Sequence, residues 1–582
     1  MSNRDYIMIA GVLAIIGLVF FSYYSRHFSL DRIKSRTVGD GQFGASRWAT
    51  KKEIDETYLQ VPFEPELWRT GKQRPTAQGL VLGCEMKKDK VIALVETGDV
   101  HALMTAASGA GKTAYFLYPN IEYALATGMS FLCTDTKGDL FRNYAGIAKK
   151  DYGYNVVIID LRNPTRSDGD NILSLVNKYM DEYLEDHKRL DAKAKAEKHA
   201  KILANTLIKS DANGDYGQNQ YFYDAAEGLL AAMILLVAEF IPADQRHIVS
   251  VYNLVQQLVG PSAVAGKTQF QLLMELLPPK HKAFWLAGAA LEASEQAMGS
   301  ILSTVLSRLN SFLDSEMEQL LCFETAIDAE KFSKEKSALF IVLPEEDATK
   351  YFMASLIIEQ LYRELLIEAD KYGGRLPNRV VFFADELGTC PPINSIEMMF
   401  SAGRSRGLML VPIVQSISGQ LRKNYGQEGT EIILENCQVN IFGGFAPGSQ
   451  TAEQLSGFLG NRTVMSGSVT QDSNTHSQNL QMTARPLMTA DELKTLPKGH
   501  FIVMKTGVHP MQVHLRLFLE WGIRFGEPYQ VEEKAQRVVP CADKTVLIHA
   551  IRERYSRRPT HEESDSPKKE PQSIQINQKF KP

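Results

Sequence analysis

A glycine-rich loop between an apolar run and a helical pattern constrains this chain more than any other feature. Residues 98–114 read GDVHALMTAASGAGKTA and contain the P-loop pattern in its permissive form, with alanine in place of the opening glycine. Because the loop residues are small, backbone N–H groups can curl around phosphate oxygens. The loop therefore predicts a nucleotide site formed by Ala106, Ala107, Ser108, Gly109, Ala110, Gly111, Lys112 and Thr113.

The residues around this loop supply the context that a P-loop requires. An apolar run at 102–104 precedes it and a helical pattern follows, so the positive end of a helix would face the anion. We expect Lys112 to reach the β- and γ-phosphates and the Thr113 hydroxyl to bind Mg²⁺. Pro119 is expected to kink the helix after its first turn. The alternative is a glycine-rich turn with an incidental lysine.

A second motif joins an apolar strand pattern to two carboxylates. Residues 379–386 read RVVFFADE, which matches the Walker B arrangement. Asp385 is expected to hold Mg²⁺ through water, and Glu386 to polarise the attacking water as a general base. Such a strand end is common by itself, and a capped turn is the alternative. Its pairing with the P-loop favours a catalytic role.

Polar residues flank the next apolar strand, predicted at 408–414. Gln415 follows the strand and is placed to sense the γ-phosphate. Arg404 and Arg406 precede it, and we expect an arginine here, Arg404, to reach into the site of a neighbouring subunit. A surface salt bridge is the alternative for either arginine.

Short apolar runs alternate with helical patterns in two parts of the chain, which predicts an α/β fold with a parallel sheet and helices on both faces. From about residue 171 to 323 the pattern is helical with almost no strand signal, which predicts an all-α insertion. Within it, 181–209 is rich in lysine; we favour a solvated helix face over contact with nucleic acid or a partner protein. The predicted strands are 130–135, 155–160, 338–343, 379–384 and 408–414.

The first residues contain an uncharged apolar stretch, 6–24, about long enough to cross a hydrocarbon core as a helix. Basic residues lie mainly after it, so the positive-inside rule predicts a single-pass membrane anchor with the bulk of the chain in the cytoplasm. A cleaved signal peptide and a buried helix are the alternatives. The last residues, 556–582, are rich in Pro, Ser, Lys, Glu and Gln, which predicts a disordered tail.

Composition excludes some classes. A formal net charge of −4 argues against a wholly basic nucleic-acid binder, although a local basic channel is compatible with it. The six cysteines are scattered, without a CxxC pair. This argues against a disulfide framework and a zinc site, and it fits a reducing compartment.

Several motifs, in order over residues 40–525, resemble those of the type IV coupling proteins, the TraG/TraD-type conjugation ATPases. Residues 44–49, GASRWA, resemble the family's segment before the motor. Residues 135–139, DTKGD, are similar to its Asp-Pro-Lys-Gly-Glu motif, with Thr for Pro and Asp for the final Glu. Residues 485–493 resemble its C-terminal signature.

The site residues fit the same resemblance. Asp385 and Glu386, Arg404 and Gln415 lie at spacings similar to the family's Walker B pair, trans arginine and glutamine. Two departures are the single apolar stretch, where the family often has two transmembrane helices, and Ala106, which should be tolerated but could weaken the grip on nucleotide.

The resemblance implies a RecA-like P-loop NTPase domain with an inserted all-α domain and an N-terminal transmembrane helix, assembled as a homo-hexamer. Its implied work is to couple hydrolysis of ATP, with Mg²⁺, to delivery of relaxase-bound single-stranded DNA into a type IV secretion channel. The expected parts are an anchor (1–28), a linker or small segment that contains strands (29–95), the nucleotide-binding domain (96–172 and 324–527), the insertion (173–323) and a partly disordered tail (528–582).

Two other functions remain open at this stage. An FtsK-like double-stranded DNA translocase shares the RecA-like fold, but the long helical insertion and the DTKGD motif favour the coupling protein. A receptor for secreted effector proteins would use the same fold without pumping DNA. A transporter-type ABC ATPase is set aside, because the faint signature at 416–420 follows Walker B instead of preceding it.

Overall fold

The computed structural model describes residues 8, 11–21, 41–209, 217–258, 260, 262, 264, 266–393, 395–472 and 475–556 of the 582-residue chain. The chain divides into two compact units. Among the described residues, the sheet unit contains those up to 169 and 325–535. The helical unit contains 170–209, 217–324 and 536–556.

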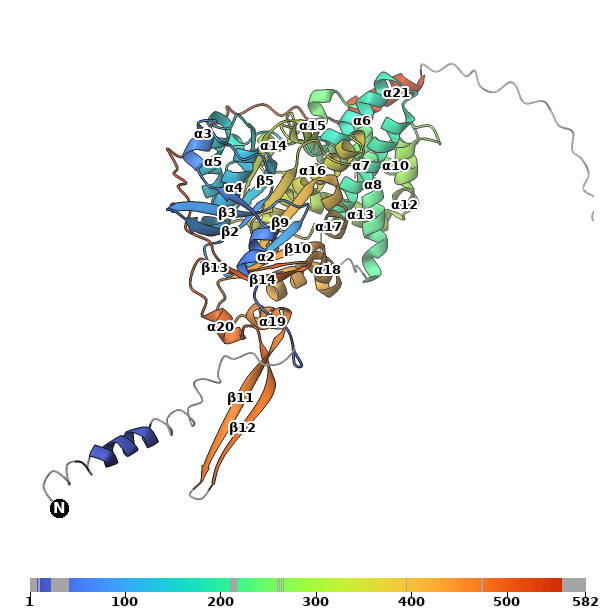
Figure 1. The fold of residues 1–582 in the computed structure, drawn as a ribbon. Coiled ribbons are helices and arrows are strands. Elements are labelled where there is room, and N and C mark those ends of the chain that lie inside the picture. The colour runs from blue at the N-terminus through green and yellow to red at the C-terminus, as the bar shows by residue number, and fades with distance from the viewer. Residues whose placement is uncertain are drawn as a thin grey trace, which may run out of the picture. The chain divides into compact units, whose positions relative to one another are not determined.

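A nine-stranded sheet forms the centre of the sheet unit, in the order β14-β13-β10-β4-β9-β8-β5-β7-β6. The run from β10 to β6 is parallel throughout, whereas β13 and β14 are antiparallel at one edge (Figure 1). The strands are β4 (His101–Ala106), β5 (Ser130–Asp135), β6 (Asn155–Asp160), β7 (Ser337–Val342), β8 (Val380–Ala384), β9 (Leu408–Val414), β10 (Cys437–Gly443), β13 (His500–Lys505) and β14 (Val508–His514).

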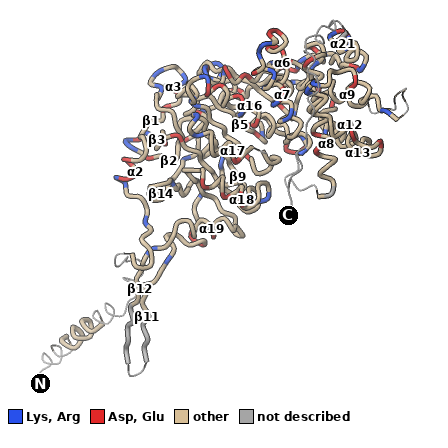
Figure 2. Tube along the Cα trace, turned by 90° about the vertical axis from the view of Figure 1, so that its right-hand side faces the viewer, with Lys and Arg blue, Asp and Glu red and all other residues tan. Residues whose placement is uncertain are grey.

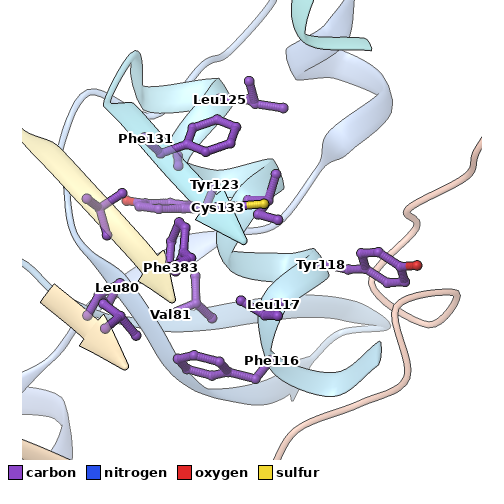
Figure 3. Packing of buried hydrophobic residues seen from close by; sticks show 14 of the residues in the cluster. Leu80, Val81, Phe116, Leu117, Tyr118, Tyr123, Leu125, Phe131, Cys133 and Phe383 are labelled. Atoms are coloured by element: carbon purple, nitrogen blue, oxygen red, sulfur yellow. The ribbon is translucent and has the colours of Figure 1, made fainter. Parts of the chain in front are cut away.

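The central strands are apolar because both of their faces are covered. Every residue of β4, β5, β7, β8 and β9 is buried. Neighbouring side chains point to opposite faces, so Phe383 joins one core with Phe131 and Tyr123 (Figure 3), while Phe382 lies with Ile358 and Ile396 in another. The predicted parallel sheet with helices on both faces is therefore confirmed.

The helices of this layer follow from the same pattern. α4 (Tyr118–Thr127) and α5 (Asp139–Lys150) belong to the first core. α16 (Tyr351–Lys371) and α17 (Ile396–Ala402) border the second, and α18 (Arg422–Asn436) follows β9. The other helices of the sheet unit are α2 (Lys51–Thr57), α3 (Pro65–Arg69), α15 (Ala329–Lys334), α19 (Gln450–Leu459) and α20 (Ala490–Lys494).

Several strands lie outside the main run. β1 (Leu59–Pro62), β2 (Leu80–Lys87) and β3 (Lys90–Glu96) form a small antiparallel sheet, in agreement with the strands expected in the linker. β11 (Asn461–Asp472) and β12 (Thr475–Pro486) form a separate two-stranded ribbon (Figure 1). The sequence reading assigned no strands to this ribbon.

The helical unit is built around α8 (Gln220–Phe240), whose residues from Leu229 to Phe240 are all buried. Among its described residues no strand is found, as the sequence pattern predicts. Its other α-helices are α6 (Ser174–Glu185), α7 (Leu190–Ile208), α9 (Ile248–Leu258), α10 (Gln269–Met274), α11 (Lys282–Leu286), α12 (Gly288–Leu291), α13 (Glu295–Leu309), α14 (Ser315–Leu321) and α21 (Lys544–Ser556).

Part of the expected tail belongs to this unit. Residues 528–582 are the expected, partly disordered tail, and of these 536–556 group with the helical unit and end in α21. The Glu239 carboxylate of α8 binds α21 to this unit, because it accepts from Arg554 Nη1 at 2.9 Å. The same carboxylate lies 3.1 Å from His281 Nε2. The disorder predicted for 557–582 lies outside the described residues.

The lysine-rich segment 181–209 carries both signs of charge (Figure 2). Arg189 pairs with Glu182 at 2.9 Å, and Lys195 lies 3.8 Å from Asp191. Lys209 lies 2.8 Å from two acidic residues of α8. The ion pairs support the interpretation of this segment as a solvated, internally paired helix face.

By length and composition, one described helix is apolar enough to cross a membrane, and it is α8, which is 67% buried inside the protein over its most apolar window. It is therefore a core helix. Within the predicted anchor, Gly11–Phe21 forms a shorter apolar helix with exposed side chains. The remaining residues of that stretch, apart from residue 8, lie outside the described residues, as do the basic residues after it. The anchor thus stays a prediction.

Candidate nucleotide-hydrolysis site

The P-loop leaves the carboxyl end of β4 and enters a π-helical turn, Lys112–Leu117, which continues into α4. Pro119 is the second residue of α4, where its missing N–H is tolerated, and the irregular π-helical turn directly precedes α4. Gly109 and Gly111 have φ of 76° and 86°, a left-handed conformation that favours glycine. A Cβ on Gly111 would lie only 2.5 Å from the Tyr115 ring.

The opening alanine of the loop has a structural explanation. Ala106 is the last residue of β4 and is 1% exposed, so its methyl group is part of the core. Its carbonyl accepts from Lys112 Nζ at 3.3 Å. The next residue, Ala107, donates its N–H to Gly444 O at 2.9 Å, which braces the loop against the end of β10. The end of β10, the strand beside β4, therefore holds the start of the loop through this hydrogen bond.

The Walker B carboxylates lie at the same edge of the sheet, because the carboxyl ends of parallel strands meet there. The Asp385 carbonyl accepts from Thr134 Oγ1 of β5 at 2.7 Å. Glu386 has φ of 54°, a left-handed conformation that costs a non-glycine residue about 1–2 kcal/mol. The left-handed conformation of Glu386 turns the chain sharply after β8.

Three predicted site residues meet directly. Gln415 Nε2 donates to both carboxylate oxygens of Glu386, at 3.0 and 2.9 Å. Lys112 Nζ lies 3.6 Å from Glu386 Oε1, and the two side chains are 8% and 18% exposed. The meeting follows from topology, since β9, which Gln415 directly follows, lies between β4 and β8.

In this cluster the negative charge of the carboxylates exceeds the positive charge of Lys112. Burial, followed by the negative charge of Glu386, raises the pKa of Asp385 to about 7, and Lys112 offsets only part of this. Burial also raises the pKa of Asp135, although three backbone N–H groups donate to its carboxylate. Asp385 therefore lies in the field of two further carboxylates, Glu386 and Asp135, and Lys112 is the cation that offsets part of their effect.

These residues fit a magnesium ion bound together with phosphate. Mg²⁺ prefers oxygen ligands and keeps several waters, so one carboxylate and one hydroxyl suffice when phosphates are present. Asp385 and the half-buried Thr113 offer these groups. The described residues contain no group of three or more His, Cys, Asp or Glu that would hold a metal by itself.

Arg404 is the predicted site residue that does not reach this cluster within one chain. It begins a short turn, Arg404–Arg406, before β9, whereas Gln415 follows β9. A strand of this length separates its ends by about 20 Å. Arg404 is exposed, while Arg406 pairs with Asp370 at 2.6 Å.

Two contributors were not assigned a role at the site by sequence reasoning. Asp135 ends an apolar strand, the same signal that identified Asp385, but it entered only as part of the DTKGD motif. Its side chain accepts from the N–H groups of Gly138 and Phe141, which fixes that motif as the start of α5. Gln420 accepts from the Gln415 N–H at 2.7 Å, and no sequence motif points to it.

Known proteins share this fold. TrwB, a bacterial conjugative coupling protein, has a structure with a TM-score of 0.54 and 17% identity, covering 85% of this chain and 99% of that one. TrwB in complex with the ATP analogue ADPNP gives a TM-score of 0.55 at 15% identity, covering 86% of this chain and 100% of that one. At such identities the likeness establishes the fold, and the predicted RecA-like P-loop fold is confirmed.

Sequence relatives agree. The type IV secretion system-coupling protein VirD4 of Bartonella quintana (strain Toulouse) is 22% identical over 453 residues, which is 74% of this chain and 65% of that protein. A probable conjugal transfer protein TraG of Sinorhizobium fredii (strain NBRC 101917 / NGR234) is 29% identical over 144 residues, 24% of this chain and 22% of that one. The chain thus spans less than two thirds of the length of these curated relatives.

The sequence model of one family, described as type IV secretory system conjugative DNA transfer, matches residues 47–540. This match covers most of the chain and includes the P-loop, both Walker B carboxylates, Arg404 and Gln415. The chain therefore belongs to the type IV secretory system conjugative DNA transfer family, the family of the type IV coupling proteins.

Proposed function

We propose that this protein is an ATPase that uses ATP and Mg²⁺ to deliver relaxase-bound single-stranded DNA into a type IV secretion channel. The observation that carries the proposal is the meeting of Lys112, Glu386 and Gln415 at the carboxyl edge of the sheet, beside the P-loop. The structures of TrwB with ADPNP and with ADP and Mg²⁺ support the choice of ligands.

The contacts of Glu386 suggest how its reactivity is controlled. Its carboxylate now receives both Gln415 Nε2 contacts and faces Lys112 Nζ. While these contacts are in place, Gln415 and Lys112 occupy the carboxylate oxygens that a water molecule would have to reach. Lys112 and Gln415 would exchange Glu386 for phosphate oxygens when nucleotide binds, which leaves Glu386 free to take a proton from water. A bound Mg²⁺ would neutralise phosphate charge, held by Thr113 and, through water, by Asp385.

Arg404 completes the site from a second copy of the chain. Because it lies at the far end of β9 from Gln415, it would serve a neighbour's site as an arginine finger supplied in trans. A ring of copies, a homo-hexamer, supplies such a neighbour to every site. Residues 6–24 would anchor the ring in the cell membrane, with the bulk of each chain in the cytoplasm.

The cargo follows from the family. Its description names conjugative DNA transfer, and the TraG relatives are named for conjugal transfer, which favours DNA, with its relaxase, over effector proteins alone. The VirD4 relative is named for coupling to a type IV secretion system, which favours the channel as a partner.

The test is the ATPase rate of the purified full-length chain with and without single-stranded DNA. We expect DNA to raise the rate several-fold, and Lys112→Ala to abolish hydrolysis, because the phosphates lose their lysine. Double-stranded DNA as the better activator would support an FtsK-like translocase instead. Capture of secreted proteins without any response to DNA would support an effector receptor. Hydrolysis by Lys112→Ala at the wild-type rate would contradict the proposed site.

A further inference from the structure

The segment that follows Gln415 holds the turn that carries Glu386. It begins with Ser416, whose Oγ accepts from the Gly419 N–H at 3.0 Å, and forms a π-helical turn, Ile417–Leu421, before α18. The turn after Glu386 is Leu387–Thr389. These two segments are far apart in sequence and contact each other through side chains.

Gln420 makes the closest contact between these two segments. Its Oε1 accepts from the backbone N–H of Gln415 at 2.7 Å. A Cβ added to Gly388 would lie 2.5 Å from Gln420 Cβ and 2.6 Å from Gln420 Oε1, so the glutamine side chain packs directly on the Gly388 backbone. Gln420 therefore touches both the residue that holds the base and the turn that carries it.

Two neighbours of Gln420 tie down the same turn. Asn424 Nδ2 donates to Gly388 O at 3.2 Å and to Cys390 O at 3.0 Å. Tyr425 Oη accepts from the Ile393 N–H at 3.3 Å. Asn424 thus bonds the turn and the residue after it, and Tyr425 bonds the chain a little further on, whereas Gln420 also reaches the residue that follows β9.

We propose that Gln420 is a positioning residue for hydrolysis, which fixes the Gln415 backbone so that the Gln415 amide meets Glu386. The proposal rests on the proposed ATPase function. Gln415 Nε2 contacts both oxygens of Glu386 at nearly equal distances, an alignment that requires a fixed backbone at residue 415. Without the Gln420 acceptor, the Gln415 N–H loses its partner and the backbone is free to rotate.

Two substitutions at this position separate positioning from packing. Gln420→Met keeps the length of the side chain but removes the acceptor, so we expect kcat for ATP to fall about tenfold or more while KM stays within about twofold. Gln420→Glu keeps an acceptor, so kcat should stay within about threefold of wild type.

Gln427→Met is the matched control, since Gln427 is an exposed glutamine of α18 whose amide donates to Glu431. It should leave kcat unchanged. If Gln420→Met does not fold, Gly388→Ala tests the same contact, because its methyl group displaces Gln420, and the same loss of kcat is expected.

Wild-type kcat in Gln420→Met, or a raised KM with kcat unchanged, would overturn the positioning role while the ATPase function stands. An equal loss of kcat in Gln420→Met and Gln420→Glu would do the same. A wild-type protein that binds ATP and does not hydrolyse it would overturn both.

Discussion

Asp385 shows at the residue scale how a binding site differs from a stabilising ion pair. Asp385 is 8% exposed and feels the negative charges of Glu386 and Asp135, which Lys112 and the Glu386 N–H offset only in part. Burying a charge without a dedicated partner costs stability. The site therefore holds an unfavourable charge that a phosphate-bound cation would relieve.

This arrangement predicts a pH dependence of stability in the nucleotide-free protein. The pKa of Asp385 is about 7 in the folded state, against 3.8 ordinarily, so the folded state binds the proton more tightly. The free energy of unfolding should then fall as pH rises through this window, by at most about 4 kcal/mol. Melting temperatures measured from pH 5 to 8 should fall more steeply for wild type than for Asp385→Asn. Parallel curves would contradict the assignment.

The backbone conformation of Glu386 is the second feature at the residue scale. A non-glycine residue at φ of 54° stores strain, and here the strained residue is the candidate general base. The P-loop, the carboxylate pair and Gln415 could be predicted from sequence because each follows an apolar strand pattern. The strain and the Gln420 contact could not, since both arise from the meeting of β8 with the turn after β9.

At the scale of elements, burial decided which strands the sequence revealed. β5, β8 and β9 are buried along their whole length and read as apolar runs. β14 alternates with exposed residues, and the ribbon of β11 and β12 is rich in Ser, Thr, Asn and Gln. Strand pairing without a continuous apolar core leaves little trace in a single sequence.

The helical unit makes an element-scale prediction for α21. Arg554→Ala removes one partner of the buried Glu239 carboxylate. Because Arg554 is 35% exposed, we expect a loss of about 1 kcal/mol, or about fivefold faster amide exchange in α21. Hydrogen–deuterium exchange of the α21 peptides measures this. Arg552→Ala, an exposed arginine on the same helix, is the control, and equal exchange in both variants would contradict the pairing.

At the scale of the whole molecule, one chain is expected to hold an incomplete site. Arg404 and Gln415 stand at opposite ends of β9, so no rearrangement of side chains alone brings Arg404 to its own Glu386. The proposed site therefore requires the Arg404 of an adjacent copy, and complementation between two defective variants tests this.

Mixtures of Arg404→Ala and Glu386→Gln proteins should recover activity. Each variant alone should be inactive, but in a random ring about a quarter of the sites combine an intact Glu386 with an intact neighbouring Arg404. ATPase assays on mixed rings measure the recovery. Mixtures of Lys112→Ala with Glu386→Gln are the control, because both residues serve their own chain's site and no complete site can form. No recovery in the first mixture would show that Arg404 does not act in trans.

The most direct measurement of the central claim is the fate of ATP bound to Glu386→Gln. This variant keeps the P-loop, Lys112 and the Asp385 carboxylate, so it should bind ATP within about threefold of the wild-type affinity. Without a base, its single-turnover hydrolysis should be slower by about a hundredfold or more. Retained binding with blocked hydrolysis is the result that the account predicts, and hydrolysis at the wild-type rate would contradict it.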